Sequence, residues 1–287
     1  MSLTVMVAHA IAICRASVRL IVRRPVPGVT LVDLTIPDLP PAFEGYKIAA
    51  LADFHHPAGG DLDWLQHTVH LVNATSPDII ALLGDYGESF KRARSLSRHS
   101  YREALSELTP HIARLDARDG IVAVLGNHDY YADADAVTAW LSQLGVNVLV
   151  NRTLSVMRKD QTLRIAGIDD VFEGRHEPMV GSDISTREPT VVLSHNPDGV
   201  LHLHPELRVD VVIAGHTHGG QIVIPGFGAP LTMTTVCGRR SASGWVPNSR
   251  TALYVTRGLG EQLPLPIRFN CAREALLLQL TKDQHPA

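Results

Sequence analysis

Five short apolar runs organise the middle of the chain, at residues 48–52, 79–83, 121–125, 191–193 and 211–214. Each run is rich in β-forming residues, and its apolar positions are continuous rather than alternating. That pattern is typical of strands that are buried on both faces of a sheet. We therefore predict that the five runs are core strands.

Helix-like patterns follow the first three runs, at residues 62–74, 101–115 and 133–144. Strand and helix in repetition predict a parallel sheet with right-handed crossovers. Further short strands are expected at residues 147–150, 154–158, 163–166, 221–224, 252–255 and 275–280. Together these patterns favour a mixed sheet packed on a second sheet, with helices outside. The glycine-rich stretch 225–243 is expected to be a functional loop, because long loops inside a domain usually carry function.

Residues of metal-ligand type follow each of the five runs. They are Asp53 and His55, then Asp85, then Asn127 with His128 and Asp129, then His195, and finally His216 and His218. Because ligands of open α/β sheets bind outside the carboxyl ends of the strands, we expect all of these side chains to meet at one edge of the sheet. Imidazole, carboxylate and amide groups without thiolates suit zinc, manganese or iron.

Taken one at a time, these residues have ordinary explanations. The chain has 15 histidines, so some follow apolar runs by chance. Gly84-Asp85 and Gly126-Asn127 are also common turn sequences. It is the ordered set at five strand ends that predicts a dinuclear site, in which two ions about 3.5–4 Å apart clamp the attacking and leaving oxygens of a phosphoryl transfer.

Composition narrows the classes of partner. The net charge is −3, the pI is about 6.6, and aromatic residues make up 5% of the chain, so no nucleic-acid-binding surface is evident. An anionic substrate must be held by local groups instead. The three cysteines, Cys14, Cys237 and Cys271, are odd in number and lack metal or redox spacing. They argue against a disulfide scaffold and favour a reducing, cytoplasmic location.

The ordered motifs resemble those of the calcineurin-like metallophosphoesterases, which read D-x-H, G-D-x-x-D, G-N-H-D/E, a histidine, and G-H-x-H. Here they stand as Asp53-Phe54-His55, Gly84-Asp85, Gly126-Asn127-His128-Asp129, His195 and Gly215-His216-Thr217-His218. The resemblance spans about residues 30 to 280. Within the family, the chain is similar to the bacterial YkuE/YaeI-type branch, on the stretches 40–45, 194–198, 215–221 and 253–260.

The resemblance implies a four-layer α/β/β/α sandwich of two mixed sheets flanked by helices. It also implies two divalent transition-metal ions, of manganese, iron or zinc. The first would be held by Asp53, His55, Asp85 and His218, and the second by Asp85, Asn127, His195 and His216, with Asp85 bridging. His128 would be catalytic, facing the substrate to stabilise phosphoryl oxygens or protonate the leaving group. The implied reaction is hydrolysis of a phosphate ester, with a phosphodiester first, by a metal-bridging hydroxide.

Two positions depart from the family pattern. Glu88 replaces the usual aspartate of the second motif, outside the expected ligand set, and His56 is an additional imidazole that we expect on a surface loop. We also expect Asp129 to orient the His128 imidazole, as carboxylates commonly orient functional histidines.

The N-terminal residues 1–30 form an apolar and basic segment ahead of a metallophosphoesterase domain at 31–282. Residues 3–14 are nearly all apolar but too short to span a bilayer, and four arginines follow, at positions 15, 19, 23 and 24. Two interpretations stay open: a helix that is packed on the protein or frayed, and peripheral contact with an anionic membrane.

The substrate and the reaction class keep alternatives. The apolar N-terminus and a loop with Leu231, Met233 and Val236 suit a lipid-linked ester, and the three candidate arginines for a phosphate contact are Arg239, Arg240 and Arg257. One rival is a non-catalytic binding protein of the same fold, which is expected to have lost ligands. Another is a metal hydrolase of amides or lactones, in which Gly-Asn-His-Asp is not expected. Every expected ligand position is filled here, which favours the phosphoesterase.

Overall fold

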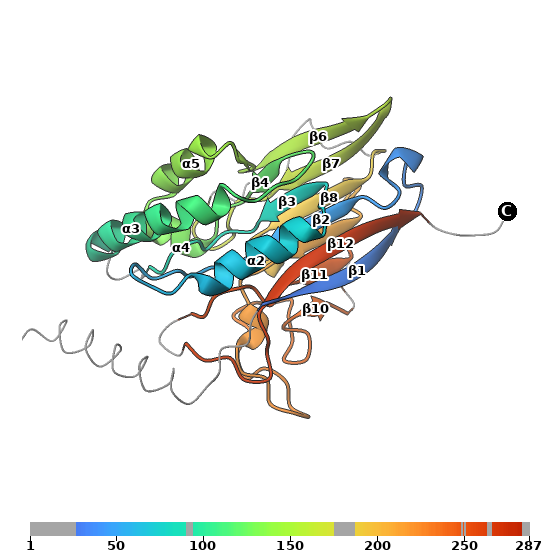
Figure 1. Ribbon diagram of the computed structural model, residues 1–287. Helices are drawn as coiled ribbons and strands as arrows, with labels where there is room; N and C mark the ends of the chain where they lie inside the picture. Colours follow the sequence, from blue (N-terminus) through green and yellow to red (C-terminus); the bar gives the residue numbers. More distant parts are fainter. Residues whose placement is uncertain are drawn as a thin grey trace, which may run out of the picture.

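Two six-stranded sheets stack face to face and form the body of the protein (Figure 1). The structure is a computed structural model that describes residues 27–89, 94–174, 187–247, 249, 251–262 and 266–282. Both sheets are mixed, and helices flank the stack. The predicted α/β sandwich of two mixed sheets with flanking helices is therefore confirmed.

In the first sheet, four neighbouring strands are parallel, and the first and last strands of the chain pair with each other at one edge. Its order is β1 (Gly28–Ile36), β12 (Glu274–Lys282), β2 (Lys47–Leu51), β3 (Ile79–Leu82), β4 (Ile121–Ala123) and β5 (Asn147–Val148). Strands β2 to β5 are parallel, whereas β12 is antiparallel to β2 and parallel to β1. The first three predicted core strands are β2, β3 and β4.

The second sheet has a parallel centre between two antiparallel edges. Its order is β10 (Gly244–Trp245), β11 (Leu253–Val255), β9 (Val211–Ala214), β8 (Thr190–Ser194), β7 (Gln161–Gly167) and β6 (Arg152–Arg158). Strands β11, β9, β8 and β7 are parallel neighbours, and β10 and β6 run antiparallel at the edges. The last two predicted core strands are β8 and β9.

The apolar runs are continuous because both faces of these strands are buried. In β2, Ile48 and Ala50 point into the core between the sheets, while Ala49 and Leu51 point to the layer of helices. Side chains alternate between the two faces of a strand, so a strand that is covered on both sides needs an apolar residue at each position.

Four α-helices cover the outer face of the first sheet (Figure 1). They are α2 (Asp63–Ala74), α3 (Arg94–Ile112), α4 (Asn127–Ala132) and α5 (Ala134–Gln143). Helix α2 buries Leu65, Val69 and Val72, which share one helix face at spacings of four and three residues. The outer face of the second sheet is covered by the 3-10 helix η3 (Pro197–His202) and by loop residues such as Cys237 and Val246.

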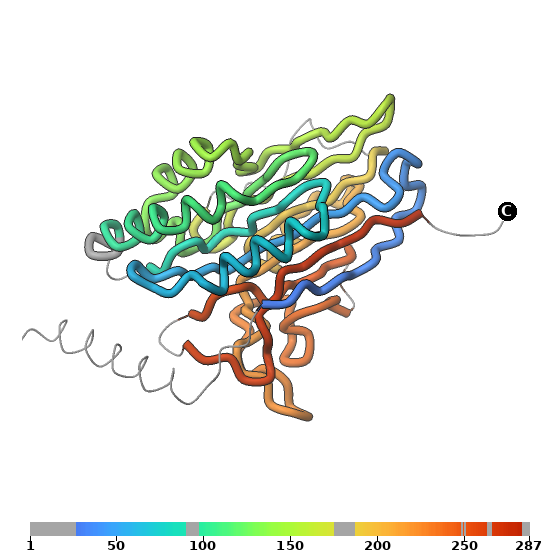
Figure 2. The backbone as a smooth tube through the Cα atoms, in the orientation of Figure 1, coloured from blue at the N-terminus to red at the C-terminus, as the bar shows by residue number. Residues whose placement is uncertain are grey.

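Several elements differ from the sequence prediction. Strand β1 was not predicted, because its positions alternate in burial and its partner β12 lies at the other end of the chain (Figure 2). Residues 221–224 do not form the predicted strand, since Ile222 and Ile224 make only isolated bridges. Helix α4 and the two-residue strand β10 are further additions.

The predicted apolar and basic segment lies, through residue 26, outside the described residues. Strand β1 begins at Gly28, shortly before the predicted domain boundary at residue 31. None of the helices that the structure describes combines the length and the hydropathy needed to cross a bilayer.

Candidate metal centre

The residues of metal-ligand type gather at one end of the sandwich, where strands of both sheets deliver them. Strands β2, β3 and β4 of the first sheet lead to Asp53, Asp85 and Asn127, and strands β8 and β9 of the second sheet lead to His195 and His216. The prediction that one sheet edge supplies the whole set is thus wrong. The two stacked sheets each supply part of the set, and the two parts meet where the carboxyl ends of these strands lie together at one end of the sandwich.

The backbone adopts an unusual conformation after strands β2, β3 and β9. Five of the predicted ligands adopt positive φ angles although they are not glycines: Asp53 at 55°, His55 at 40°, Asp85 at 57°, His216 at 68° and His218 at 53°. This left-handed conformation costs roughly 1–2 kcal/mol for an L residue, so it persists only where the surroundings enforce it. Here backbone hydrogen bonds do so, such as those from the Asp53 amide to the Gly84 carbonyl and from the His55 amide to the Asp85 carbonyl.

A first cluster joins Asp53, His55 and His218. One ligand atom from each lies within 4.8 Å of the others, and all three residues are buried. The Nε2 atoms of His55 and His218 face each other at 3.1 Å, and the His218 Nε2 lies 3.8 Å from the Asp53 carboxylate. Three lone-pair donors thus point at one small volume.

A second cluster joins Asp85, His195 and His216, again with ligand atoms within 4.8 Å. The His195 Nε2 is 3.2 Å from each of three atoms: the Asp85 Oδ2, the His216 Nδ1 and the Asn127 Oδ1. The other ring nitrogen of His195 lies 2.8 Å from the Leu83 carbonyl, which accepts its proton. That bond directs the Nε2 lone pair inward.

Asp85 lies between the two clusters. Its Oδ2 is 3.3 Å from the His55 Nε2 and 3.2 Å from the His195 Nε2, while its Oδ1 accepts a hydrogen bond from the His128 amide. A third group, His55, Asp85 and His128, also has ligand atoms within 4.8 Å. One carboxylate therefore reaches both clusters, as a bridging ligand must.

The residues present fit two divalent cations. Nitrogen and oxygen ligands without a thiolate suit manganese, iron or zinc. Burial opposes protonation of His195, yet the carboxylates of Asp85 and Asp53 raise its pKa to about 10. Burial likewise opposes ionisation of Asp85, but His195 and His128 hold the pKa of that carboxyl well below its usual range. The cluster thus attracts positive charge, and within the described part of the chain the buried His218 Nδ1 and His216 Nε2 have no hydrogen-bond partner.

His128 lies beside the clusters, but its neighbours differ from those predicted. The expectation that Asp129 orients its imidazole is wrong. Asp129 is fully buried and accepts hydrogen bonds from the backbone amides of Asp85, Tyr86 and Gly126. Its carboxylate therefore connects the turn at Asp85 with the turn at Gly126 instead of contacting the ring.

The carboxylate closest to the His128 ring belongs to Glu88. The Glu88 Oε1 lies 3.6 Å from the His128 Nδ1, and its Oε2 lies 3.4 Å from the His55 Nδ1. Burial lowers the pKa of His128, although the Asp85 and Glu88 carboxylates oppose that shift. The departure from aspartate at position 88 therefore places a longer carboxylate between two imidazoles.

Gln262 contacts the other ring nitrogen of His128, and Gln221 holds Gln262. The Gln262 side-chain Nε2 lies 3.2 Å from the His128 Nε2, and the Gln262 backbone N–H donates to the Gln221 Oε1 at 2.6 Å. Gln221 in turn follows the turn that carries His218, and its backbone N–H donates to the His218 carbonyl. Gln262 was not predicted, because it follows the stretch 253–260 in a loop that holds none of the predicted ligands.

Two further residues that the sequence did not indicate brace the site. Arg268 is buried and donates to the carbonyls of Gly260, Arg257 and His218. Tyr101, on α3, donates its hydroxyl proton to the Asp129 carboxylate and accepts a hydrogen bond from the Gly87 amide at 3.0 Å.

His56 was expected on a surface loop, but the structure buries it. It is 1% exposed, and its Nε2 lies 2.6 Å from the Glu107 carboxylate of α3. The prediction failed because the same carboxylate also binds the Gly59 amide and so closes the loop over the ring. His56 thereby fastens the loop after Asp53 and His55 to the helical layer.

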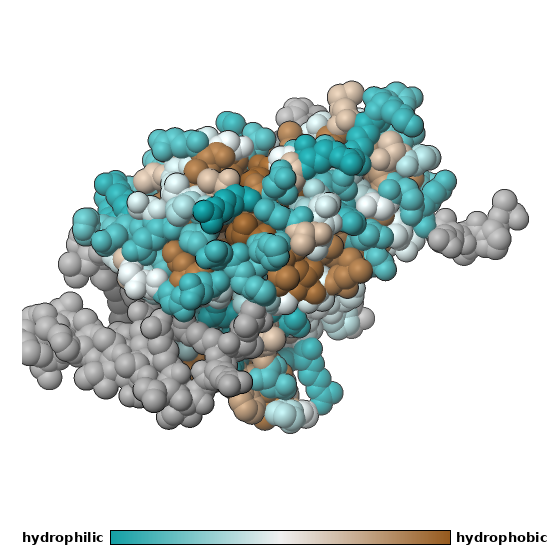
Figure 3. Space-filling view, in the orientation of Figure 1, coloured by the Kyte–Doolittle hydropathy of each residue, from teal (hydrophilic) through white to brown (hydrophobic). Residues whose placement is uncertain are grey.

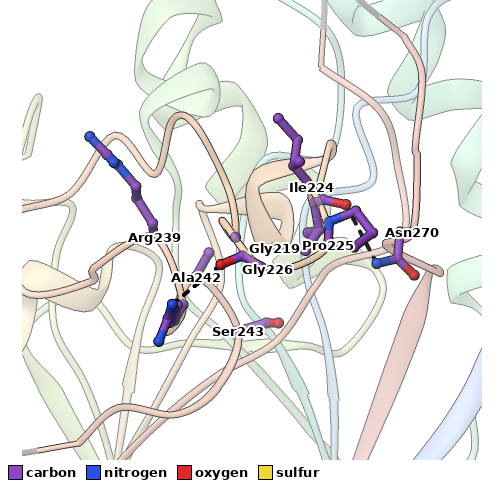
Figure 4. Close-up of a pocket in the computed structure, with 11 residues that line it drawn as sticks. Gly219, Ile224, Pro225, Gly226, Arg239, Ala242, Ser243 and Asn270 are labelled. Carbon is purple, nitrogen blue, oxygen red and sulfur yellow. Dashed lines mark hydrogen bonds between the residues drawn. The ribbon is translucent and has the colours of Figure 1, made fainter.

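The candidate arginines fall into two groups. Arg257 donates to the Ala272 carbonyl and to Thr30, and its guanidinium lies 3.5 Å from Glu274, so it braces the fold. Arg239 and Arg240 are exposed and line a cavity beside the Gly219 turn, shown in Figure 4.

Comparison with known proteins gives concordant matches. The family model for calcineurin-like phosphoesterases matches residues 46–220. The chain is 30% identical over 236 residues to phosphodiesterase YaeI of Escherichia coli and 30% identical over 247 residues to the uncharacterized metallophosphoesterase YkuE of Bacillus subtilis. Those matches cover 82% and 84% of this chain, and 82% and 81% of the two relatives.

A longer relative matches over part of its length. The chain is 30% identical over 249 residues to a transmembrane protein with metallophosphoesterase domain from Danio rerio, which covers 82% of this chain and 53% of that protein. The chain thus spans about half the length of that relative.

Proposed function

Because this chain belongs to the calcineurin-like phosphoesterase family, we propose that it is a dinuclear-metal phosphoesterase that hydrolyses a phosphodiester. One observation carries this proposal. The Asp53 and Asp85 clusters converge on a single carboxylate, that of Asp85, which reaches an imidazole of each. We propose that residues 31–282 form the catalytic domain and that β1 belongs to it.

We assign the ligands as the family pattern suggests. The first ion would be held by Asp53, His55, Asp85 and His218, and the second by Asp85, Asn127, His195 and His216. Bound there, two ions would polarise the phosphoryl group and lower the pKa of a coordinated water towards about 7.

The other side chains of the site would act on the substrate. His128 groups with His55 and Asp85, and its Nε2 nitrogen lies next to the Gln262 amide. A protonated ring there can donate to the leaving oxygen; burial lowers the pKa of the ring, and the Glu88 carboxylate, 3.6 Å from the Nδ1, opposes that effect. Gln262 supplies a neutral amide that can hold the ring or a substrate oxygen in place.

A lipid-linked ester, hydrolysed by a cytoplasmic protein in peripheral contact with a membrane, is the finer part of the proposal. Its support is that Leu231 and Met233, two of the residues that suggested it, are 71% and 67% exposed. Val236, the third, packs instead on the outer core of the second sheet.

A substrate panel tests the function. Protein reconstituted with manganese, iron or zinc is assayed on bis(4-nitrophenyl) phosphate, 4-nitrophenyl phosphate, a lactone and an anilide, with Asp85→Asn as the matched inactive variant. We expect metal-dependent hydrolysis of the diester that Asp85→Asn abolishes. Faster hydrolysis of the lactone or anilide would establish the rival hydrolase class, and metal binding without turnover of any ester would support the non-catalytic alternative.

A further inference from the structure

A single loop concentrates exposed apolar side chains next to the candidate metal centre. We call residues 221–240 the apolar loop; Figure 1 shows it as the orange segment that projects from the lower end of the sandwich. It exposes Ile224, Phe227, Leu231 and Met233 by 43%, 45%, 71% and 67%. Exposed hydrophobic residues occur singly on most surfaces, whereas a group of them marks an interaction site.

The charged side chains of the loop are all positive. Residues 219–247 contain Arg239 and Arg240 and no aspartate or glutamate. Both arginines are exposed. Arg239 stacks on the Phe227 ring, with its guanidinium carbon 4.5 Å from the ring centre. The apolar side chains therefore lie on the same loop as two arginines, and the carboxylate of Asp198, which reaches the loop from η3, is occupied by the Thr235 and Val236 amides. Figure 3 shows hydrophobic and hydrophilic atoms side by side at this end.

Hydrogen bonds within the loop give it a defined conformation. The Ala229 amide donates to the Arg239 carbonyl at 2.7 Å, and the Ile224 amide donates to the Gly228 carbonyl at 2.9 Å. Arg240 donates to the Gly226 carbonyl, one of the bonds drawn in Figure 4. These bonds hold the apolar side chains outward, where they cannot pack on the domain.

The loop also borders the metal cluster. A side chain at Gly220, which closes the His218 turn, would collide with Ala229 and approach the Leu231 carbonyl to 3.1 Å. The half-exposed Phe172 stands beside His216, with ring centres 5.2 Å apart. Phe172 therefore lies against His216, and the loop that carries Leu231 packs on the turn that carries His218.

Beside the loop lies a cavity of about 390 Å³, lined by Gly219, Arg239, Arg240 and Asn270 (Figure 4). That volume is within the range of small-molecule sites. Its exposed guanidinium groups suit a phosphate-bearing headgroup.

We propose that the apolar loop docks on the surface of an anionic phospholipid bilayer. Leu231, Met233, Ile224 and Phe227 would enter the interfacial layer, and Arg239 and Arg240 would contact lipid phosphates. Apolar side chains flanked by arginines are the combination that binds such interfaces. The docking deepens the proposed function, on which its catalytic consequence rests: it would present the metal centre to esters that are linked to membrane lipids.

Sedimentation of the full chain with vesicles tests the docking. Two vesicle types are used, pure phosphatidylcholine and a mixture with phosphatidylserine. The chain offers matched controls: Met233→Gln is paired with Met157→Gln, which is 70% exposed on β6, and Leu231→Gln is paired with Leu201→Gln, which is 61% exposed on η3. Any binding by residues 1–26 is common to all four variants. Melting curves verify that each variant is folded.

We expect Met233→Gln and Leu231→Gln each to lower the partition coefficient about 10-fold or more, because burial of such a side chain contributes roughly 1.5–3 kcal/mol. Arg239→Gln and Arg240→Gln should each lower it about 5-fold on phosphatidylserine vesicles, as about 1 kcal/mol per basic residue implies. Met157→Gln and Leu201→Gln should bind as the unmodified chain does.

Three results would overturn the docking. Equal partition of the loop variants and their paired controls would remove the loop from membrane binding. Equal binding to both vesicle types would remove the anionic lipid. A concentration-dependent dimer that Met233→Gln dissolves, with unchanged vesicle binding, would assign the loop to a second copy of the chain. Sedimentation does not require turnover, so an inactive protein that still pellets refutes the proposed function alone.

Discussion

Replacing Tyr101 by phenylalanine tests whether α3 holds the metal-motif turns in place. The ring is 2% exposed and packs against Gly87, where any side chain would collide with it. Phenylalanine keeps that packing and removes only the hydroxyl. Two hydrogen bonds are lost: the one given to the Asp129 carboxylate, and the one accepted from the Gly87 amide.

The magnitude follows from the types of the two bonds. A hydrogen bond to a charged group contributes about 1.5–3 kcal/mol, and a buried amide left without a partner costs about 1–3 kcal/mol. We expect the free energy of unfolding to fall by about 3 kcal/mol. For a domain of this size, 1 kcal/mol shifts the melting temperature by roughly 2 °C, so the midpoint should fall by about 6 °C.

The assay is thermal unfolding of metal-free protein, since bound ions would add their own stabilisation. Tyr86→Phe is the matched control. Tyr86 is fully buried, but its hydroxyl makes a single 3.3 Å bond to the neutral Val124 carbonyl, which contributes about 1 kcal/mol. If both variants melt at the same temperature, the Tyr101 hydroxyl does not brace the Asp129 carboxylate, and the reasoning fails.

Four further predictions concern the site and its surroundings. Asp85→Ala should lower the bound metal at both positions, measured by elemental analysis, whereas loss of one ion alone would contradict its bridging role. His128→Ala should keep the metals yet lose about 10²–10⁴-fold in rate, more on an alkyl diester than on a nitrophenyl ester, and equal losses would remove its role towards the leaving group. Gln262→Glu places a carboxylate beside the His128 Nε2 and should raise the pKa of the imidazole that donates the proton, so the alkaline limb of the pH–rate profile should move to higher pH; an unmoved limb would show that the two side chains do not interact. Burial opposes ionisation of Glu107, but the Gly59 amide and His56 lower its pKa, so the stabilisation by this carboxylate is present above the ordinary pKa of glutamate and is lost as the pH falls through the lowered pKa; the stability difference from Glu107→Gln should shrink over that range, and a constant difference would show that the ionised carboxylate does not stabilise the fold.

The core strands could be predicted because burial on both faces leaves a local trace. Strand β2 is apolar and buried at every position from Ile48 to Leu51, and this continuous run is visible in the local sequence. Strand β1 leaves no such trace. Its burial alternates, and it is fixed by pairing with β12, which lies some 240 residues later, as between Gly28 and Glu274. A pairing of that sequence separation is a tertiary effect that local patterns do not report.

The candidate ligands could be named from the sequence, but the residues around them could not. Each ligand follows an apolar run, so its place at a strand end is local information. Glu88 was visible as a position of the second motif, although its contact with His128 was not. Gln262 and Tyr101 reach His128 and Asp129 from separate segments, and only the packing of α3 and of the last loops brings them there. The error over Asp129 has the same origin, since adjacency in sequence suggested a contact that the turn geometry redirects to three backbone amides.

Stability and metal binding favour different residues at the positions with left-handed backbone, which are Asp53, His55, Asp85, His216 and His218. Glycine adopts that conformation without the steric cost, and its introduction would also remove a buried imidazole or carboxylate from a crowded polar cluster. A library screened for heat resistance of the metal-free protein should therefore enrich substitutions at these positions that abolish activity. Screening in the presence of metal reverses the preference, because each retained ligand then contributes binding free energy to the folded state. For engineering, the metal concentration during selection therefore decides whether the stabilised variants keep their metal ligands and their activity.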